Sequence, residues 1–226
     1  MTASSNSDTH YTLVIGNKNL SSWSLRPWIL MRHAGIPFDE IKIMLDQPDT
    51  EALIRAHSAA GKVPVLYAGD LVIWDSLAIC ETVAERWPQK QLWPADPDVR
   101  AFARSISAEM HAGFQKLREC MPMNCRAMGR IVPLPDELNA DIERVIAIWS
   151  HCHKHYGADG GWLFGAFSIA DAMFAPVVLR FRTYGINVPE SAGFYPHRVL
   201  QSEAMQEWLA AAETEVEVIE ADETGK

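Results

Sequence analysis

The stretch GKVPVLYAGDLVIWDS, residues 61–76, decides how the rest of the chain is interpreted. Its two short β-branched runs, 65–67 and 71–73, are separated by a Gly-Asp turn, which predicts a small antiparallel hairpin at a sheet edge. Pro64 lacks an N–H and keeps the preceding residue extended, so the backbone of Val63 is free to pair with an extended ligand. The alternative is an ordinary strand-edge proline.

Asp75 and Ser76 follow the hairpin at the point where an apolar helix is predicted to begin. A helix start has unsatisfied N–H groups that attract a carboxylate, and the Asp75 side chain can bind an ammonium group. Together these residues would hold the amino-acid end of a zwitterionic peptide. The alternative is that one of them is simply the N-cap of the helix.

Composition limits the possible ligands. The chain has 226 residues, of which 48% are hydrophobic, and its net charge is −9, so no basic face for nucleic acid or an anionic membrane is expected. Four irregularly spaced cysteines indicate reduced thiols and a cytoplasmic location. No apolar run reaches the roughly 20 residues of a membrane span. A small molecule is therefore the expected partner.

The order of elements predicts two domains of different class. Strand, helix, strand, helix, hairpin and helix follow one another as in an α/β unit of thioredoxin size, and helical spacings of three and four take over after a proline-rich segment. The predicted organisation is a disordered polar tail (1–10), a thioredoxin-like domain (11–87), a linker (88–97) and an all-helical domain (98–226). One helix is expected over 102–121, and the acidic segment 213–226 is expected to be solvated or frayed.

Three serines lie at the turn between the first strand and the first helix. Pro27 is tolerated best in the first helical turn, which favours Ser24 as the N-cap. Ser21 and Ser22 would then lie in the loop ahead of the helix, with both hydroxyl groups available to a ligand.

Histidines at 151, 153 and 155 invite a metal site, because His151 and His155 are one helical turn apart. They stand at the end of a predicted helix, where cationic side chains are favoured by the helix dipole. Surface histidines, and no metal, are the favoured interpretation.

The Val-Pro corner, the Asp-Ser helix start, the proline linker and a Ser-x-x-Asp capping box at Ser168 and Asp171 follow one another in an order that resembles the cytosolic glutathione transferases. The resemblance covers nearly the whole chain. The resemblance implies glutathione as co-substrate. By this resemblance, the backbone of Val63, beside a cis Pro64, pairs with the cysteinyl part of glutathione, and Asp75 and Ser76 hold its γ-glutamyl end. Lys62 would lie near the glycyl carboxylate.

The sequence SSWSLR, residues 21–26, is similar to the Ser-Ser-Cys-Ser-x-Arg signature of the zeta class, which includes maleylacetoacetate isomerase. Trp23 stands where that signature has cysteine, which weakens the isomerase assignment and disfavours the classes that use a cysteine. Counting back from Arg26, the resemblance to the serine-type members makes Ser22 the first choice for the catalytic hydroxyl and Ser21 the second.

The chemistry implied is ionisation of a thiol. A free thiol has a pKa of about 8.5, and a serine hydroxyl near the positive end of a helix favours the thiolate. A pKa lowered by about two pH units corresponds to roughly 2.7 kcal/mol. The predicted walls of the electrophile pocket are Trp23, Met110, Phe114 and Met121, for which ordinary core is the alternative.

The resulting hypothesis is a cytoplasmic glutathione transferase that conjugates a small hydrophobic electrophile, or isomerises it, as in detoxification. The alternatives are a non-catalytic binding or regulatory protein with the same fold, and a maleylacetoacetate-type isomerase. A homodimer is implied by the resemblance alone.

Overall fold

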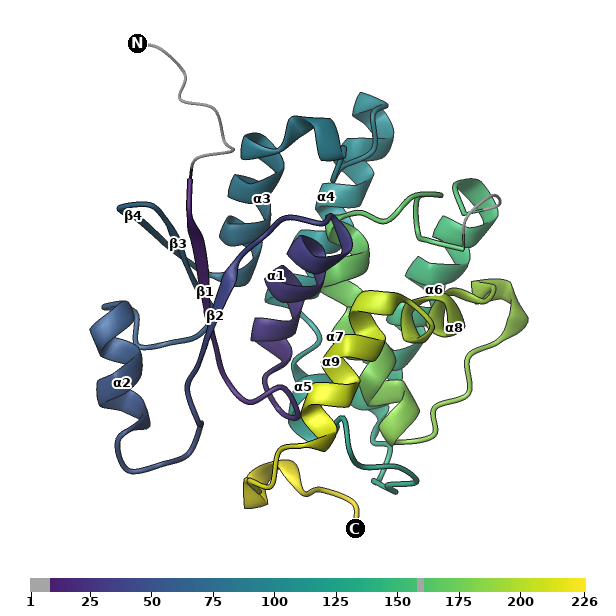
Figure 1. Cartoon of the computed structure of the whole chain (residues 1–226). Helices are drawn as coiled ribbons and strands as arrows, with labels where there is room; N and C mark the ends of the chain where they lie inside the picture. The colour runs from purple at the N-terminus through teal and green to yellow at the C-terminus, as the bar shows by residue number, and fades with distance from the viewer. Residues whose placement is uncertain (1–8, 158–160) are drawn as a thin grey trace.

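The computed structural model describes residues 9–157 and 161–226, so most of the predicted tail 1–10 lies outside the described residues. The first part of the chain contains β1 (Tyr11–Ile15), α1 (Ser22–His33), β2 (Asp39–Lys42), α2 (Thr50–His57), β3 (Val65–Ala68), β4 (Leu71–Trp74) and α3 (Ser76–Arg86). The second part contains α4 (Pro97–Ala112), α5 (Gln115–Cys120), α6 (Asp136–His155), α7 (Ile169–Thr183), α8 (Tyr195–Leu200) and α9 (Glu203–Glu213). Figure 1 shows the sheet on one side and the helices of the second part on the other.

The sheet has the order β2-β1-β3-β4. The first crossover makes β1 and β2 parallel, and the hairpin adds β3 and β4 antiparallel, with Val14 opposite Val65 and Val65 opposite Trp74. The predicted fold class, a thioredoxin-like α/β domain followed by a helical domain, is confirmed. No helix in the described ranges 9–157 and 161–226 is both long and apolar enough to cross a membrane.

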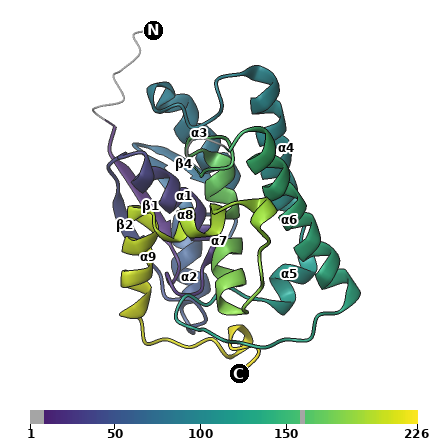
Figure 2. The same cartoon turned by 90° about the vertical axis from the view of Figure 1, so that its right-hand side faces the viewer.

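Helix α7 lies at the centre of the molecule and is buried on nearly every side. It packs against α1 from the first part and against α4 and α8 from the second, as Figure 2 shows. Eleven of the fifteen residues of α7 are apolar, as expected of a helix that is buried on nearly every side. This contact between α1 and α7 joins the two parts of the chain beside the turn that carries Ser21 and Ser22.

The start of α1 differs from the prediction. Ser21 is the N-cap and Ser22 the first helical residue, and the N–H of Leu25 donates to the Ser21 carbonyl oxygen over 3.2 Å. Pro27 therefore lies in the second turn, where only the carbonyl of Trp23 loses a hydrogen-bond partner. The prediction that Ser24 caps the helix was wrong, because a proline near the helix start is tolerated beyond the first turn when its neighbours pack well.

The predicted helix over 102–121 is interrupted. Helix α4 ends at Ala112, Phe114 adopts a left-handed conformation with φ +59°, and α5 begins at Gln115. The Phe114 ring is buried, which offsets the cost of this backbone conformation. The Arg118 side chain bridges the break by donating to the carbonyl oxygens of Met110 and Gly113.

The prediction that 213–226 is solvated or frayed was also wrong. Glu213 ends α9, and the chain beyond it runs back along the molecule as the yellow segment at the bottom of Figures 1 and 2. Glu215 is buried, and Glu223 accepts hydrogen bonds from Asn124 and Arg130. The prediction failed because the hydrogen-bond partners of these acidic residues are far away in the sequence and could not be recognised from the acidic run itself.

Candidate functional site

A cleft of about 510 Å³ opens between the 61–76 stretch and the start of α1. The chain segments 20–23 and 60–64 form its two long sides, Trp74 and Asp75 close one end, and His111 reaches in from α4. Most residues that the sequence predicted for glutathione and for catalysis line this one cleft, namely Ser21, Ser22, Lys62, Val63, Pro64 and Asp75, and so does Trp23, which was predicted for the electrophile pocket.

The Val63 corner lies just ahead of β3, an inner strand of the sheet. The Val63–Pro64 peptide is cis, and β3 begins only at Val65. Val63 makes no backbone hydrogen bond with another residue of the described ranges. Its N–H and carbonyl can therefore pair with an extended backbone laid into the cleft.

Asp75 is both the N-cap of α3 and part of the cleft. One carboxylate oxygen accepts hydrogen bonds from the N–H groups of Leu77 and Ala78, over 2.9 and 3.2 Å. The other lies 3.0 Å from Nε2 of His111. Ser76, in contrast, is buried, lies 3.5 Å from Nη1 of Arg26 and does not line the cleft. The structure thus brings Asp75 to the cleft and places Ser76 behind it.

His111 is a cleft residue that the sequence prediction missed. Its ring packs edge-on against Trp23, with 5.4 Å between ring centroids, and burial lowers the pKa of its imidazole. Its Nδ1 atom is buried and has no hydrogen-bond partner in the described residues. The local sequence does not identify His111 as a site residue. It lies on α4 next to the buried apolar residues of that helix, and its contact with Asp75 forms only when the chain is folded.

Three arginines gather behind Trp23. The guanidinium carbons of Arg26 and Arg118 lie 4.1 and 4.8 Å from the centre of the Trp23 ring, and Nη2 of Arg180 donates to Oγ of Ser22 over 3.2 Å. Burial, together with the neighbouring cations, lowers the pKa of Arg180 to about 10 and that of Arg26 well below its usual value. The hydrogen bonds of all three go to carbonyl and hydroxyl oxygens, so the cluster creates a positive potential beside the serines.

The two serines have different partners. Oγ of Ser21 lies 2.7 Å from Oγ of Ser24, which also accepts the Gly16 N–H. Oγ of Ser22 accepts from Arg180, which leaves the Ser22 hydroxyl hydrogen available to a group in the cleft.

The predicted apolar wall is placed differently. Met110, Phe114 and Met121 are 1%, 6% and 0% exposed and belong to the main hydrophobic core, not to the cleft. Trp74, which is 56% exposed, stands with Trp23 at the cleft instead. The helical pattern identified an apolar face but could not tell which of its residues face the core.

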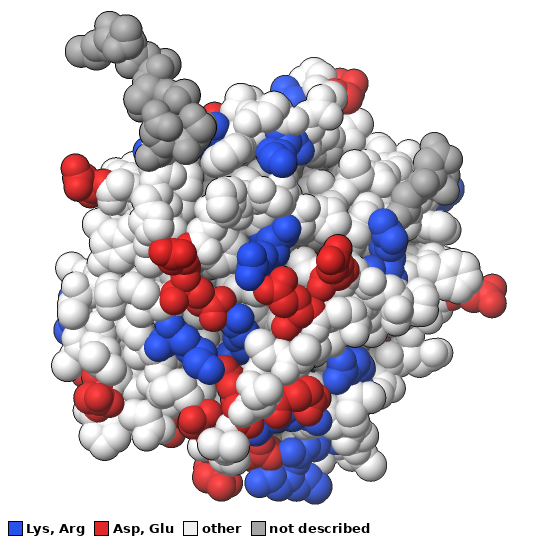
Figure 3. Space-filling view, viewed as in Figure 1, with Lys and Arg blue, Asp and Glu red and all other residues white. Residues whose placement is uncertain are grey.

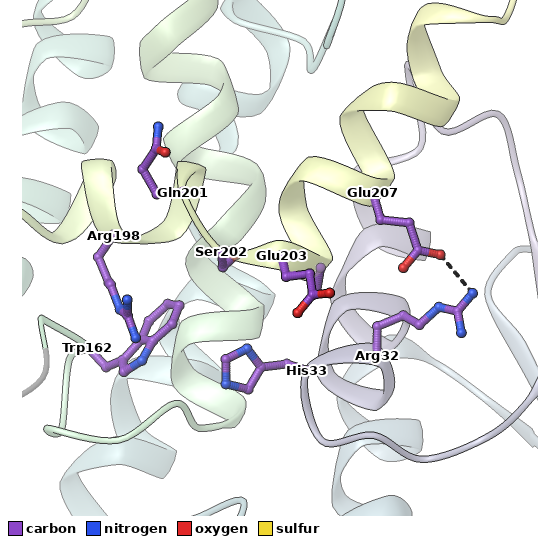
Figure 4. Close-up of a pocket in the computed structure, with 9 residues that line it drawn as sticks. Arg32, His33, Trp162, Arg198, Gln201, Ser202, Glu203 and Glu207 are labelled. Atoms are coloured by element: carbon purple, nitrogen blue, oxygen red, sulfur yellow. Dashed lines mark hydrogen bonds and ion pairs between the residues drawn. The ribbon is translucent and has the colours of Figure 1, made fainter.

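A second hollow of about 410 Å³ lies between the end of α1 and the α8–α9 turn (Figure 4). Arg198 lies against the Trp162 ring, and Arg32 pairs with Glu207 over 2.7 Å. None of the sequence-predicted site residues lines it. It is a polar depression whose arginines are solvent-exposed, away from the Val63 corner.

The rings of His151 and His155 are neighbours on α6, with 4.5 Å between their centroids and 38° between their planes. Within the part of the chain that the structure describes, no group of three or more His, Cys, Asp or Glu side chains is arranged to hold a metal ion.

Comparison with known proteins finds similarity in sequence over the first part of the chain and similarity in fold over most of it. The family description "Glutathione S-transferase, N-terminal domain" matches residues 20–86, which include both long sides of the cleft. A probable maleylacetoacetate isomerase of Caenorhabditis elegans is 30% identical over 96 residues, which is 42% of this chain and 44% of that protein. A stringent starvation protein A homologue of Coxiella burnetii is 24% identical over 93% of this chain and 96% of its own length.

Solved structures agree with the fold. A glutathione transferase homologue from Burkholderia with bound glutathione superimposes with a TM-score of 0.68 and 22% identity, over 90% of this chain and 98% of that one. The family match includes every residue that lines the cleft except His111, and the structural match covers both parts of the chain. Residues 20–86 of this chain are therefore similar to the N-terminal domain of glutathione S-transferases, and the chain as a whole shares the fold of the solved glutathione transferase homologue.

Proposed function

We propose that this protein is a glutathione transferase in which the hydroxyl of Ser22 holds the thiolate of glutathione. The observation that supports this most is the convergence, in one cleft, of an extended backbone at Val63, an acid at Asp75 and a serine pair at the start of α1. Each group matches one part of a zwitterionic thiol tripeptide.

In the proposed complex the tripeptide lies along the 60–64 side of the cleft. The backbone of Val63 pairs with the cysteinyl residue, and the Lys62 ammonium binds the glycyl carboxylate. The α-ammonium of the γ-glutamyl end binds the Asp75 oxygen that faces His111. This orientation directs the thiol towards the 20–23 side of the cleft, where both serines lie.

Ionisation of the thiol depends on the surroundings of Ser22. Ser22 donates its hydroxyl hydrogen to the sulfur while its oxygen accepts from Arg180, and this second bond makes the hydroxyl a stronger donor. The buried arginines and the N-terminus of α1 add positive potential. All three effects lower the pKa of the bound thiol, and the released proton passes to solvent.

The thiolate then attacks an electrophilic carbon. In a conjugation a carbon–sulfur bond forms and a leaving group departs with its electron pair, or a conjugated double bond accepts the sulfur and then a proton. In an isomerisation the same carbon–sulfur bond forms and breaks again after rotation. Trp23 and Trp74 offer an apolar surface for the electrophile beside the sulfur.

A non-catalytic role is the second candidate. It is favoured by the near full-length similarity to a protein named for stringent starvation and not for a transferase activity. On the face in Figure 3, acidic and basic side chains are mixed and form no continuous basic surface, so that face offers no site for nucleic acid. A maleylacetoacetate-type isomerase is supported by the partial similarity to the worm protein.

One set of measurements separates these functions. Glutathione is titrated onto the protein, the ultraviolet absorbance of its thiolate is recorded against pH, and turnover is assayed with a chlorodinitrobenzene and with maleylacetone-type compounds. Binding with thiolate at neutral pH and turnover supports the transferase. Binding without thiolate or turnover supports the non-catalytic role, and turnover of the maleyl compounds alone supports the isomerase.

Asp75→Asn should weaken glutathione binding at least tenfold, because the amide keeps the shape and one cap acceptor but removes the charge that binds the ammonium group. Isothermal titration calorimetry measures the dissociation constant. Asp96→Asn is the matched control, since Asp96 caps α4 through the N–H groups of Asp98 and Val99 but does not line the cleft. Equal affinity in both variants would remove Asp75 from the binding site.

We further propose a cytoplasmic homodimer acting on small electrophiles, as in detoxification. All four cysteines are free thiols, which supports a reducing compartment. Light scattering should give about twice the mass of one 25.3 kDa chain, and a monomeric mass would contradict the dimer.

A further inference from the structure

The loop between β1 and α1 is held by a residue almost two hundred positions away in the sequence. The carboxylate of Glu215 accepts hydrogen bonds from the backbone N–H groups of Lys18 and Asn19, over 2.8 and 2.9 Å. One of its oxygens also lies 3.1 Å from the Lys42 ammonium group on β2. Its side chain is 2% exposed, so these three groups replace water around a buried acid.

Without Glu215 this loop would contain two unsatisfied donors. Lys18 and Asn19 are both buried, and within the described residues no other acceptor is bonded to either of their N–H groups. Buried backbone donors are paired in nearly all native structures, so losing the carboxylate would leave the loop in a conformation it cannot keep.

The restrained loop is connected to Ser21 and Ser22 by backbone hydrogen bonds. The N–H of Ser21 donates to the carbonyl oxygen of Asn17 over 2.8 Å, and the N–H of Ser22 to that of Leu20 over 3.0 Å. Lys18 and Asn19 lie inside the first of these turns, which runs from Asn17 to Ser21. The backbone that places both hydroxyl groups at the cleft is therefore fixed on one side by Glu215.

The segment that carries Glu215 is itself anchored. Arg126 donates to the carbonyl oxygens of Glu215 and Glu217, and its own N–H donates to Oδ1 of Asn19 over 2.9 Å. Further along, the N–H of Ile131 donates to the carbonyl oxygen of Gly225 over 3.0 Å. The C-terminal segment is thus bonded to both the β1–α1 loop and the 122–131 loop, and these two loops are also bonded to each other.

We propose that Glu215 is a positioning residue for thiol activation: the C-terminal segment supplies the carboxylate that keeps the β1–α1 loop, and with it Ser22, in the geometry that ionises glutathione. This inference rests on the proposed function. Glu215 does not line the cleft, so it acts only through the loop. A displacement of about 1 Å at a reacting group can lower a rate about 100-fold, so a loosened loop has a measurable cost.

Three full-length variants test the proposal. Glu215→Ala removes both acceptor oxygens, and Glu215→Gln keeps one of them. Glu217→Gln is the matched control, because among the residues that the structure describes the Glu217 side chain is bonded only to its neighbour Val216. Two readouts are compared: amide exchange at Lys18 and Asn19 by NMR, and the apparent pKa of bound glutathione from its thiolate absorbance.

The expected result is loss of amide protection at Lys18 and Asn19 in Glu215→Ala, with the thiol pKa raised by about one pH unit, which corresponds to about tenfold less thiolate. We expect kcat to fall about tenfold while KM for glutathione changes less than twofold. Glu215→Gln should be intermediate, and Glu217→Gln should behave like the wild type.

Two other outcomes overturn the proposal. If a folded Glu215→Gln or Glu215→Ala variant keeps the wild-type thiol pKa, Glu215 does not position the site. If both amides stay protected in the variants, the carboxylate does not hold the loop. A wild type that forms no thiolate contradicts the proposed function instead, and the amide exchange still decides whether Glu215 holds the loop.

Discussion

Ser22→Ala should lower kcat/KM with glutathione and a chlorodinitrobenzene about 100-fold, the loss typical of removing one positioned hydrogen-bond donor from a developing or bound anion. The physical reason is that the Ser22 hydroxyl is polarised by Arg180 and has its hydrogen available to the sulfur. The apparent pKa of bound glutathione should rise towards the value of about 8.5 for a free thiol. Thiolate absorbance measured against pH checks this directly.

Ser21→Ala is the matched control for this prediction. Ser21 lines the same cleft and is equally buried, but its hydroxyl is paired with that of Ser24. We expect a loss of about threefold or less in this variant, in line with a hydroxyl that does not contact the sulfur. A large loss in Ser21→Ala with little change in Ser22→Ala would reverse the assignment. Full thiolate formation in both variants would rule out serine activation altogether.

Asp171→Ala should lower the free energy of unfolding by about 3 kcal/mol or more, the effect of leaving several buried donors without an acceptor. The Asp171 carboxylate is fully buried and accepts hydrogen bonds from the N–H of Leu163 (3.0 Å), the N–H of Ser168 (2.8 Å) and the hydroxyl of Ser168 (2.9 Å). It thereby caps α7, the central helix that packs against α1. Urea unfolding at pH 7 measures the loss.

Ser168→Ala provides the control, because it removes one hydroxyl donor and leaves the carboxylate bonded to two N–H groups. Its cost should be about 1 kcal/mol. Equal stabilities of Asp171→Ala and the wild type would show that the capping box contributes nothing to folding.

The same residue gives a pH dependence with a defined sign. Burial raises the pKa of Asp171 to about 6 from a usual value of 3.8, so the folded state binds a proton that the unfolded state releases. The stabilisation that comes from binding this proton is therefore complete below about pH 4 and is lost as the pH rises through about 6, whereas the hydrogen bonds that the Asp171 carboxylate accepts remain at pH 7. Relative to Asp171→Asn, the wild type should become more stable between pH 7 and pH 5. A difference that is independent of pH would contradict this assignment.

Local sequence signals predicted much of the fold. The hairpin, the helix start at Asp75 and the capping box at Ser168 depend on contacts between residues a few positions apart, and each lies where the pattern placed it. The errors fell where a local rule was outweighed by packing. Pro27 lies beyond the first helical turn, and the buried ring of Phe114 stabilises a break that the apolar spacing of 102–121 conceals.

The candidate site divides in the same way. Seven of the predicted residues line one cleft because they belong to two short segments whose order along the chain carries the family signature. Met110, Phe114 and Met121 were predicted to line the electrophile pocket but lie in the core. An amphipathic pattern shows that one face of a helix is buried, but it does not show which part of the protein covers that face.

By itself, the sequence determined the chemistry of the cleft: an extended corner at Val63, an acid at Asp75 and hydroxyl groups near the start of a helix. Only the tertiary structure decided what surrounds those groups. His111 contacts Asp75, and Arg180 donates a hydrogen bond to Ser22. Glu215 binds the loop at Lys18 and Asn19, and its contact with Lys18 joins residues 197 positions apart. Side-chain electrostatics depend on distance in space, which a one-dimensional pattern does not contain, so the groups that tune the site become known only once the chain is folded.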